Sequence, residues 1–363
     1  MKLFLKVNKQ EQQKKEKYIS QIFCDIMSST TLKNLPNEIL TQVLRYLEIR
    51  DLFSFGHLST RTRAVSRDKT LWKKVTIRNK TLKSEFLKFI VRNGCKFLKL
   101  IDVQLKGSLH LRKSSILSDL SLDSCAIKHQ VLEEFLASCH CLTKFTLRDM
   151  DVSDVHIKSL KKFVLQNRKT LQKLELRPSE RLNLESIKSI VTNLNELTEV
   201  NLRRNCYARD EILSEQSINY LANNLTEKVV KLNLGSQVYV EDEHVMKLIR
   251  RCKRLTELSL NGTSISNDSL ICIIENLKHT LVTLSLCNTD LKFDELLELK
   301  AMAKLKVLNC SHLTYLPMDN LKEQYPNFND YQLLSAAFLV KGFKITTGSS
   351  SISWPKDLFI LEI

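Results

Sequence analysis

Three arginines recur in the sequence at a spacing that would let them act together on an anion. Arg148, Arg177 and Arg203 follow one another at intervals of 29 and 26 residues, and Lys144 and Lys173 stand four residues before the first two. A guanidinium group donates two parallel hydrogen bonds to a carboxylate or a phosphate, whereas a lysine ammonium acts as a point charge. If the fold aligns these five side chains, they form a candidate binding surface for an acidic or phosphorylated protein segment.

Glu175 and Glu199 fall among these cations and define the alternative. Carboxylates on neighbouring strands would pair with the lysines and arginines and leave a self-neutralised surface with no ligand. Both interpretations require that the strands carrying these residues lie side by side in the fold.

No residue pattern typical of an active site occurs in the sequence. A P-loop, a Gly-x-Gly-x-x-Gly loop, a His-Glu-x-x-His pair and a Gly-x-Ser-x-Gly elbow are all absent, and the chain has only 7 glycines. Cys139-His140-Cys141 contains metal-ligand residue types, but no second cluster completes a tetrahedral set. We therefore predict no catalytic residue, no metal and no cofactor, and expect the protein not to be an enzyme.

An internal repeat organises most of the chain. Leu117, Leu120, Leu122, Cys125 and Ile127 follow the spacing L-x-x-L-x-L-x-x-C-x-L, and related frames recur along the sequence. The ten units begin at residues 72, 95, 117, 142, 171, 197, 229, 255, 281 and 305. Apolar residues at the fourth and sixth positions predict a short strand with one buried face, and the following residues have a helical period. Such units cannot bury their apolar faces alone and must stack.

This pattern resembles the leucine-rich-repeat family in its longer, cysteine-containing variety, over residues 72–316. The resemblance implies an α/β solenoid, a horseshoe with parallel strands on the concave face and helices on the convex face. The third, fifth and seventh positions of each unit would point onto the concave face. Lys144 and Lys173 hold third positions and Arg148, Arg177 and Arg203 hold seventh positions, so the repeat aligns all five.

A second module precedes the repeats. Leu35-Pro36 opens an amphipathic helical pattern, a second begins at Asp51, a third begins after Ser59, and Leu71-Trp72-Lys73 closes the segment. Residues 32–74 resemble an F-box of three short helices, except that Thr62 stands where this family usually has a large apolar residue. The resemblance implies docking on a Skp-type adaptor through the first helix. The implied adaptor-binding residues are Leu35, Pro36, Glu38, Ile39, Leu40, Val43, Leu44 and Leu47.

An F-box followed by such repeats resembles the substrate-recognition subunits of Skp–cullin–F-box ubiquitin ligases. The implied partners are a Skp-type adaptor, a cullin held through it, and a protein substrate on the repeats. Two alternatives stay open: a scaffold that binds the adaptor without delivering substrates, and an acidic-ligand or nucleic-acid binder. The second alternative would use residues 61–113, which hold sixteen lysines and arginines against three acids, although aromatic residues, on which bases would stack, make up only 7% of the chain.

Composition bounds the remaining expectations. The chain has 363 residues, a net charge of +16 and 43% hydrophobic residues, which is typical of a globular protein. No apolar run approaches the roughly 18 residues of a membrane span, and ten scattered cysteines favour reduced thiols in the cytoplasm or nucleus. Residues 1–31 form a lysine-rich extension with an amphipathic helix predicted near its end, and residues 317–363 form a predicted C-terminal cap and tail.

Overall fold

The computed structural model describes residues 35–109, 115–150, 154–177, 182–204, 213–291, 296, 298–309 and 344–345. The predicted helix within 1–31 lies outside these residues, as does all of 317–363 except the pair 344–345. The chain divides into two compact units. The first includes the described residues up to Val75 together with Phe89–Lys96, and the second comprises Thr76–Lys88 and the described residues from Phe97 onward.

The first unit is helical, as the F-box resemblance predicts. It contains α2 (Asn37–Leu44), α3 (Ile49–Phe55), α4 (Thr60–Ser66) and the single-turn α5 (Lys69–Trp72). Each helix buries only a few side chains, among them Leu40, Leu44, Leu52, Phe55 and Trp72. The sequence predicts three helices in this segment. The fourth, α5, is a single turn that contains Leu71 and Trp72, two of the residues predicted to close the segment.

Local hydrogen bonds explain how so small a core holds its helices in place. Ser59 and Thr62 form a reciprocal capping box at the start of α4: the Thr62 N–H donates to Ser59 Oγ at 3.0 Å, and the Ser59 N–H donates to Thr62 Oγ1 at 2.8 Å. Trp72 is fully buried and its indole Nε1–H donates to the carbonyl of Ser66 at 2.6 Å. Thr62 thus differs from the large apolar residue that is usual in an F-box, and its side chain stabilises the start of α4 through the capping box.

The second unit is a sheet backed by helices, and its strands fall where the repeat pattern predicts them. The strands are β1 (Lys74–Lys83), β2 (Phe97–Lys106), β3 (Asp119–Asp123), β4 (Ala126–Ile127), β5 (Lys144–Arg148), β6 (Lys173–Arg177), β7 (Glu199–Asn201), β8 (Lys231–Asn233), β9 (Glu257–Ser259), β10 (Thr283–Ser285), β11 (Val307–Asn309) and β12 (Lys344–Ile345). The helices are α6 (Ser84–Arg92), α7 (His129–Ala137), α8 (Asp154–Gln166), α9 (Leu184–Asn193), α10 (Glu215–Asn224), α11 (Asp242–Arg251) and α12 (Asn267–Leu277), with a 3₁₀ turn, η2, at Glu298–Ala301.

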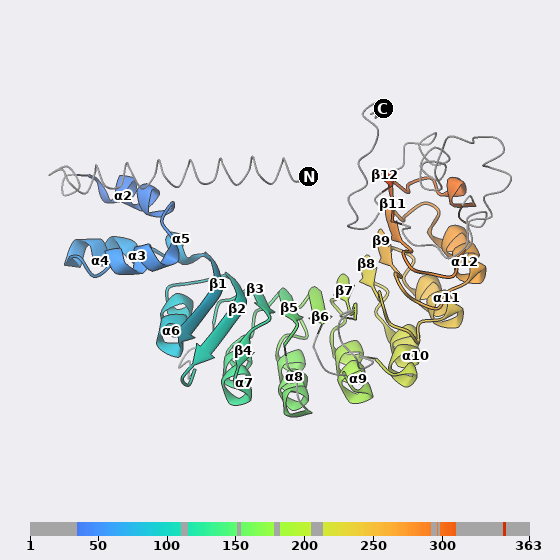
Figure 1. Cartoon of the computed structure of the whole chain (residues 1–363), viewed down its shortest axis with the longest axis horizontal. Helices are drawn as coiled ribbons and strands as arrows, with labels where there is room; N and C mark the ends of the chain where they lie inside the picture. The colour runs from blue at the N-terminus through green and yellow to red at the C-terminus, as the bar shows by residue number, and fades with distance from the viewer. Residues whose placement is uncertain are drawn as a thin grey trace. The chain divides into compact units, whose positions relative to one another are not determined.

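The strands follow one another across the sheet in chain order, except that β4 pairs with β2 beside this path, and the described pairings from β2 to β12 are parallel. Within this unit the strands line the inner side of an arc and α7 to α12 line its outer side (Figure 1). The predicted α/β solenoid is therefore confirmed. The strand β12 adds one pairing beyond the tenth repeat, because Lys344–Ile345 lies in parallel beside Val307–Leu308.

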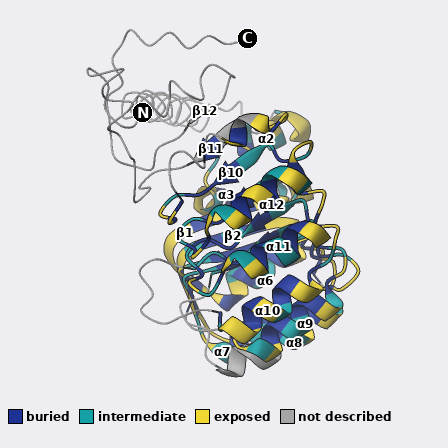
Figure 2. Cartoon of the chain, turned by 90° about the vertical axis from the view of Figure 1, so that its right-hand side faces the viewer, coloured by how far each residue is buried: buried dark blue, intermediate teal, exposed yellow. Residues whose placement is uncertain are grey.

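Burial follows the repeat frame. In β6 the burial alternates strictly, with Leu174 and Leu176 buried between partly exposed residues. Helix residues at spacings of three and four, such as Ile187, Ile190 and Val191 of α9, complete the core between strand and helix. Figure 2 shows this division on the helices, whose exposed residues lie on the outer surface. The third-position and seventh-position residues remain at least partly exposed in β3, β5 and β6, whereas the fifth-position residues Ser121, Thr146 and Ser285 are buried.

Candidate functional site

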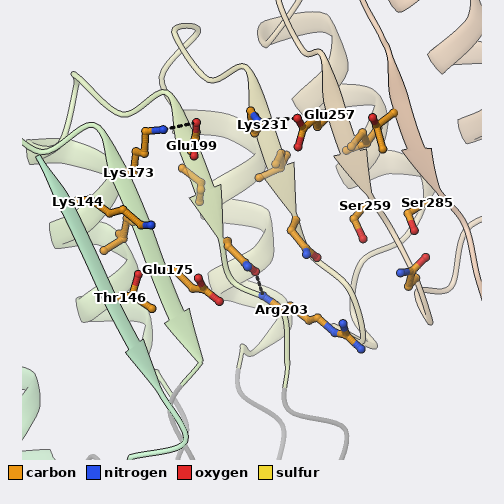
Figure 3. A pocket seen from close by; sticks show the side chains of 18 of the residues that line it. Lys144, Thr146, Lys173, Glu175, Glu199, Arg203, Lys231, Glu257, Ser259 and Ser285 are labelled. Carbon is orange, nitrogen blue, oxygen red and sulfur yellow. Dashed lines mark hydrogen bonds and ion pairs between the residues drawn. The ribbon is translucent and has the colours of Figure 1, made fainter. Parts of the chain in front are cut away.

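The concave side of the second unit holds an open groove that crosses β5 to β10 (Figure 3). We call this feature the concave groove. It has a volume of about 460 Å³. The polar residues that line it are Lys144, Thr146, Lys173, Glu175, Glu199, Asn201, Arg203, Lys231, Asn233, Glu257, Ser259, Asn261, Thr283 and Ser285. The apolar core lies between the strands and the helices, and the concave side of the sheet carries a groove lined mostly by polar residues.

The third-position residues form a row in which each lysine of the groove pairs with a carboxylate on a neighbouring strand. Lys173 Nζ lies 2.8 Å from Glu199 Oε1, Lys231 Nζ lies 2.6 Å from Glu257 Oε1, and Lys144 Nζ lies 3.9 Å from Asp119 Oδ2. The hydrogen bond to Glu257 raises the pKa of the Lys231 ammonium, although partial desolvation opposes the shift. Two of the five predicted binding cations, Lys144 and Lys173, therefore lie in a neutralised row.

Arg148 is the most strongly paired cation of the seventh-position row. Its Nε and Nη2 each donate to one carboxylate oxygen of Glu175 at 2.7 Å, and its Nη1 lies 3.7 Å from Asp123 Oδ2. The hydrogen bonds with Glu175 raise the pKa of this guanidinium, with further contributions from the charges of Asp123 and Asp149. Here the structure supports the self-paired alternative, because Arg148 has its bidentate carboxylate partner within the chain.

Arg177 and Arg203 have a different environment. Arg177 is the direct register partner of Arg148 on the next strand, and Arg203 follows Asn201, the partner of Glu175, by two residues. Neither guanidinium forms an ion pair with a carboxylate among the described residues, and the Nε of each is shielded from solvent without a hydrogen-bond acceptor. The predicted cluster of five cations is thus brought to one face, where three are paired and two are not.

Asparagine and serine side chains fill the rest of the groove beside Arg203. The Oδ1 atoms of Asn201, Asn233 and Asn261 accept backbone N–H groups of Arg203, Gly235 and Cys287 at 3.1, 2.9 and 2.8 Å. These bonds fix the orientation of the three amides, so their Nδ2 groups are the atoms that remain to donate into the groove. Ser259 and Ser285 add hydroxyl groups without charge.

The first unit carries the residues predicted to bind an adaptor, and they divide between surface and core. Pro36, Glu38 and Ile39 are exposed, with Ile39 at 42%, while Leu35, Val43 and Leu47 are half-buried. Three further large apolar side chains of this unit, Tyr46, Phe53 and Leu58, are exposed at 71%, 36% and 60%. An apolar surface of this kind on a small helical unit is typical of a protein-binding face.

Leu40 and Leu44 do not lie on that surface. They are 2% and 1% exposed and contribute to the core of the first unit, where α2 packs on α4. The helical period explains the assignment, since Leu40 and Leu44 are four residues apart and share one face of α2, while Ile39 is turned about 100° away from Leu40. Leu40 and Leu44 thus support the docking face from beneath, and the adaptor-binding set stays a prediction.

Most of the described cysteines of the repeats are buried, whereas Cys141 is exposed and Cys287 is partly exposed. Cys139, from the predicted Cys139-His140-Cys141 cluster, is fully buried, and desolvation raises the pKa of its thiol to about 11. Cys252 shows the same behaviour, with its pKa raised to about 11 by burial. Among the described residues no group of three or more His, Cys, Asp or Glu side chains is arranged to hold a metal ion. No helix in the described part of the chain is long and apolar enough to cross a bilayer.

Comparison with known proteins agrees with this division. The model of the F-box-like family matches residues 32–78. An internalin, InlF, from Listeria monocytogenes aligns over 78% of this chain and 89% of its own, with 12% identity and a TM-score of 0.41. The leucine-rich repeat-containing protein LegL7 from Legionella pneumophila aligns over 77% and 86%, with 17% identity and a TM-score of 0.39.

The two structural likenesses are weak, and the repeat fold rests on the strand order and burial described above. The chain carries an F-box-like domain followed by a leucine-rich-repeat fold, as the sequence resemblance predicts.

The set of site residues predicted from the sequence omitted the carboxylates that pair with its cations. The partners Asp119, Asp123 and Glu257 were not among the predicted site residues, although each occupies a third or seventh position of its unit. Aligning those positions for every unit would have found them. The amide orientations of the asparagines depend on backbone geometry, for which the sequence carries no signal.

Proposed function

We propose that this protein is a substrate-recognition subunit of a Skp–cullin–F-box ubiquitin ligase. The observation that carries the proposal is the presence, in one chain, of an F-box-like domain with an exposed apolar helix face and of a repeat sheet with an open polar groove. F-box domains generally bind Skp-type adaptors, and proteins that combine an F-box with leucine-rich repeats are typically non-catalytic adaptors.

The proposed mechanism is tethering. The first unit would hold the chain on the adaptor, and through it on a cullin, while the repeats hold the protein to be ubiquitinated. A tethered lysine has a high effective concentration near the ubiquitin-loaded enzyme, so the gain in rate comes from proximity. This mechanism requires no acid, base, nucleophile or metal from the chain.

The docking face is tested by binding of the purified full-length chain to a recombinant Skp-type adaptor. The test variant is Pro36→Ala with Ile39→Glu, which removes apolar contact and places a charge in the proposed interface. The matched control is Ile271→Glu, because Ile271 lies on a helix of the repeats and is 39% exposed, close to the 42% of Ile39. Circular dichroism of each variant checks that the fold is unchanged.

We expect the wild type and Ile271→Glu to bind equally and the test variant to bind at least about tenfold more weakly, since about 1.4 kcal/mol of lost contact gives that factor. Unchanged binding of the Pro36/Ile39 variant would refute the docking face. Addition of a cullin and its ubiquitin-loading partners then separates a ligase subunit, on which captured proteins become ubiquitinated, from a scaffold, on which they do not.

A further inference from the structure

The first two strands of the repeat sheet carry a surface that is rich in lysine and arginine and poor in acidic residues. Within the second unit, residues 76–88 and 97–109 contain six lysines and arginines against two acids. The first end of the sheet (Figure 1) is thus separate from the concave groove, whose lining begins at β5. We define the β1–β2 surface by three residues of each strand: Arg78, Lys80 and Lys83 of β1 and Phe97, Lys99 and Lys106 of β2.

The five cations of the β1–β2 surface form no ion pair within the part of the chain that the structure describes. Of the two acids in these residues, Glu85 lies 2.7 Å from Lys88, which leaves Asp102 against five cations. The next strand, β3, marks the limit of the surface, because its aspartates Asp119 and Asp123 pair with cations of β5. The fold therefore neutralises the lysines of the groove and leaves the charge of the β1–β2 surface uncompensated.

The backbone of the two strands spreads these cations over one continuous surface. Asn79 has a positive φ of 51°, which interrupts the alternation of β1, so the four residues from Arg78 to Thr81 are all exposed. The hydroxyl of Thr81 donates to Oε1 of Gln104 at 3.3 Å, across an interval of 23 residues. Lys83 and Lys106 are separated by the same interval, so the two lysines lie beside each other on adjacent strands.

An aromatic ring stands next to these charges. Phe97 is 39% exposed, although phenylalanine is a residue type that proteins usually bury. It shares the outward face of β2 with Lys99, two residues further along the strand, while Leu98 between them is buried. Proteins that bind single-stranded nucleic acid combine cations that hold the phosphates with aromatic side chains on which bases stack. The β1–β2 surface contains both kinds of residue.

We infer that the β1–β2 surface binds single-stranded nucleic acid, with phosphates held by the four lysines and Arg78 and a base stacked on Phe97. An acidic polypeptide would neutralise the cations, but its carboxylates would make no use of the ring. A duplex keeps its bases stacked on one another and would offer this surface its phosphates alone. The inference is independent of the proposed function, because it uses neither the helices of the first unit nor the concave groove.

The charges are tested with the full-length protein, in the absence of an adaptor, by fluorescence anisotropy of labelled single strands of about 15 nucleotides. Oligo-uridine and oligo-thymidine distinguish RNA from DNA as the source of the ligand. The test variant replaces three lysines by glutamine: Lys80→Gln, Lys83→Gln and Lys106→Gln. The control removes three charges from exposed residues of α11 and the turn after it: Arg250→Gln, Lys253→Gln and Arg254→Gln. Circular dichroism checks that each variant is folded.

We expect the triple-lysine variant to bind at least about tenfold more weakly than the wild type and the control variant to bind as the wild type does. The plot of log K against log salt concentration should become less steep by about 2 in the triple-lysine variant, because each phosphate contact on a single strand contributes about 0.7 to the slope. Equal losses in the two variants would overturn the site, since the attraction would then come from the net charge of the whole protein.

The ring is tested by two substitutions of Phe97. Phe97→Leu keeps an apolar side chain and removes the aromatic face, whereas Phe97→Tyr keeps that face. We expect Phe97→Leu to bind the single strands at least about fivefold more weakly, the lower limit for the stacking of one base, and Phe97→Tyr to bind as the wild type does. Unchanged binding by Phe97→Leu, or a duplex of the same length bound as tightly as the single strand, would overturn the assignment to single strands.

Competition with polyglutamate separates nucleic acid from an acidic polypeptide. We expect polyglutamate to displace the labelled strand only at a concentration of charges at least about tenfold higher than that of unlabelled oligo-uridine or oligo-thymidine, since stacking adds to the charge contacts. Equal displacement by polyglutamate at the same concentration of charges would overturn the inference and assign the surface to an acidic polypeptide.

Discussion

At the scale of single residues, buried amides connect one repeat to the next. Asn167 is fully buried, and its Oδ1 accepts the N–H of Leu142 at 3.0 Å while its Nδ2 donates to the carbonyl of Cys139 at 2.8 Å. Gln237 has a similar role, since its buried Nε2 donates to the carbonyl of Leu202 at 2.6 Å. Cys139 and Leu202 belong to the preceding repeats, so each amide satisfies a backbone carbonyl of the repeat before its own.

We expect Asn167→Ala to destabilise the repeats by about 1–3 kcal/mol, because it removes the partner of the Leu142 N–H and of the Cys139 carbonyl, which lies in the preceding repeat. The control is Asn193→Ala. Asn193 Nδ2 donates to Ser189 O, four residues earlier, as Asn167 Nδ2 does to Phe163 O, but Asn193 forms no hydrogen bond with another repeat among the described residues. Urea unfolding checks both. Equal losses in the two variants would contradict a special role for the connection between repeats.

At the scale of elements, one helix is capped by a residue of the preceding repeat. The carboxylate of Asp242 accepts the backbone N–H groups of Ser266 and Ser269, at 2.8 and 3.3 Å, and their hydroxyls, at 2.7 and 2.5 Å. Ser266 is the N-cap of α12, so an acidic residue from α11 holds the positive end of the next helix. Burial alone would raise the pKa of Asp242, but these hydrogen bonds outweigh it and lower the pKa below its usual value of 3.8.

A carboxyl group whose pKa is lowered by folding stabilises the fold above its unfolded pKa and loses this contribution as the pH falls through its folded value. We therefore expect Asp242→Asn to be less stable than the wild type at pH 7, by about 1 kcal/mol as for a lost helix cap. The difference should shrink below about pH 4. Urea unfolding of both proteins at pH 7 and near pH 3 measures it, and a difference that stays constant with pH would exclude the charge of Asp242 as its cause.

The capping box of α4 gives a second prediction at this scale. Ser59→Ala removes the acceptor of the Thr62 N–H, and we expect a loss of about 1 kcal/mol in the stability of the first unit. Hydrogen exchange of peptides from residues 59–66 checks this, with Ser214→Ala, which uncaps α10 in the repeats, as the control. Faster exchange in residues 59–66 of the Ser214→Ala variant would show that the effect is not local.

Prediction from sequence succeeded for the elements and only in part for the site. The repeat frame located ten strands because the fourth and sixth positions must be apolar to enter the core, as Leu174 and Leu176 do. The same frame placed Arg148 and Arg177 side by side. The repeat frame could not predict that, among the described residues, Arg148 is paired and Arg177 is not, because the partner of Arg148, Glu175, lies on the next strand, 27 residues away in the sequence. In α2, apolar periodicity marked Leu40 as important without separating core from docking face.

At the scale of the whole molecule, the division into two compact units predicts separable stability. Leu44→Ala removes a fully buried side chain of the first unit, and Leu258→Ala does the same in the repeats, where Leu258 is 3% exposed. Each change should cost about 2–5 kcal/mol in its own unit.

Hydrogen exchange should rise in residues 35–75 for the first variant and in the repeats around β9 for the second. Multi-unit chains commonly unfold in more than one step. A uniform rise along the whole chain in either variant would instead show a single cooperative unit.

The two outer strands of the sheet bear on how the protein behaves at high concentration. At one end, β1 exposes Arg78, Lys80 and Lys83, and at the other the last described strand, β12, is only two residues long. Charged edges and very short edges both hinder the addition of a strand from another molecule. A long parallel sheet is a ready template for fibrils, and the charges that β1 exposes oppose such growth at this strand.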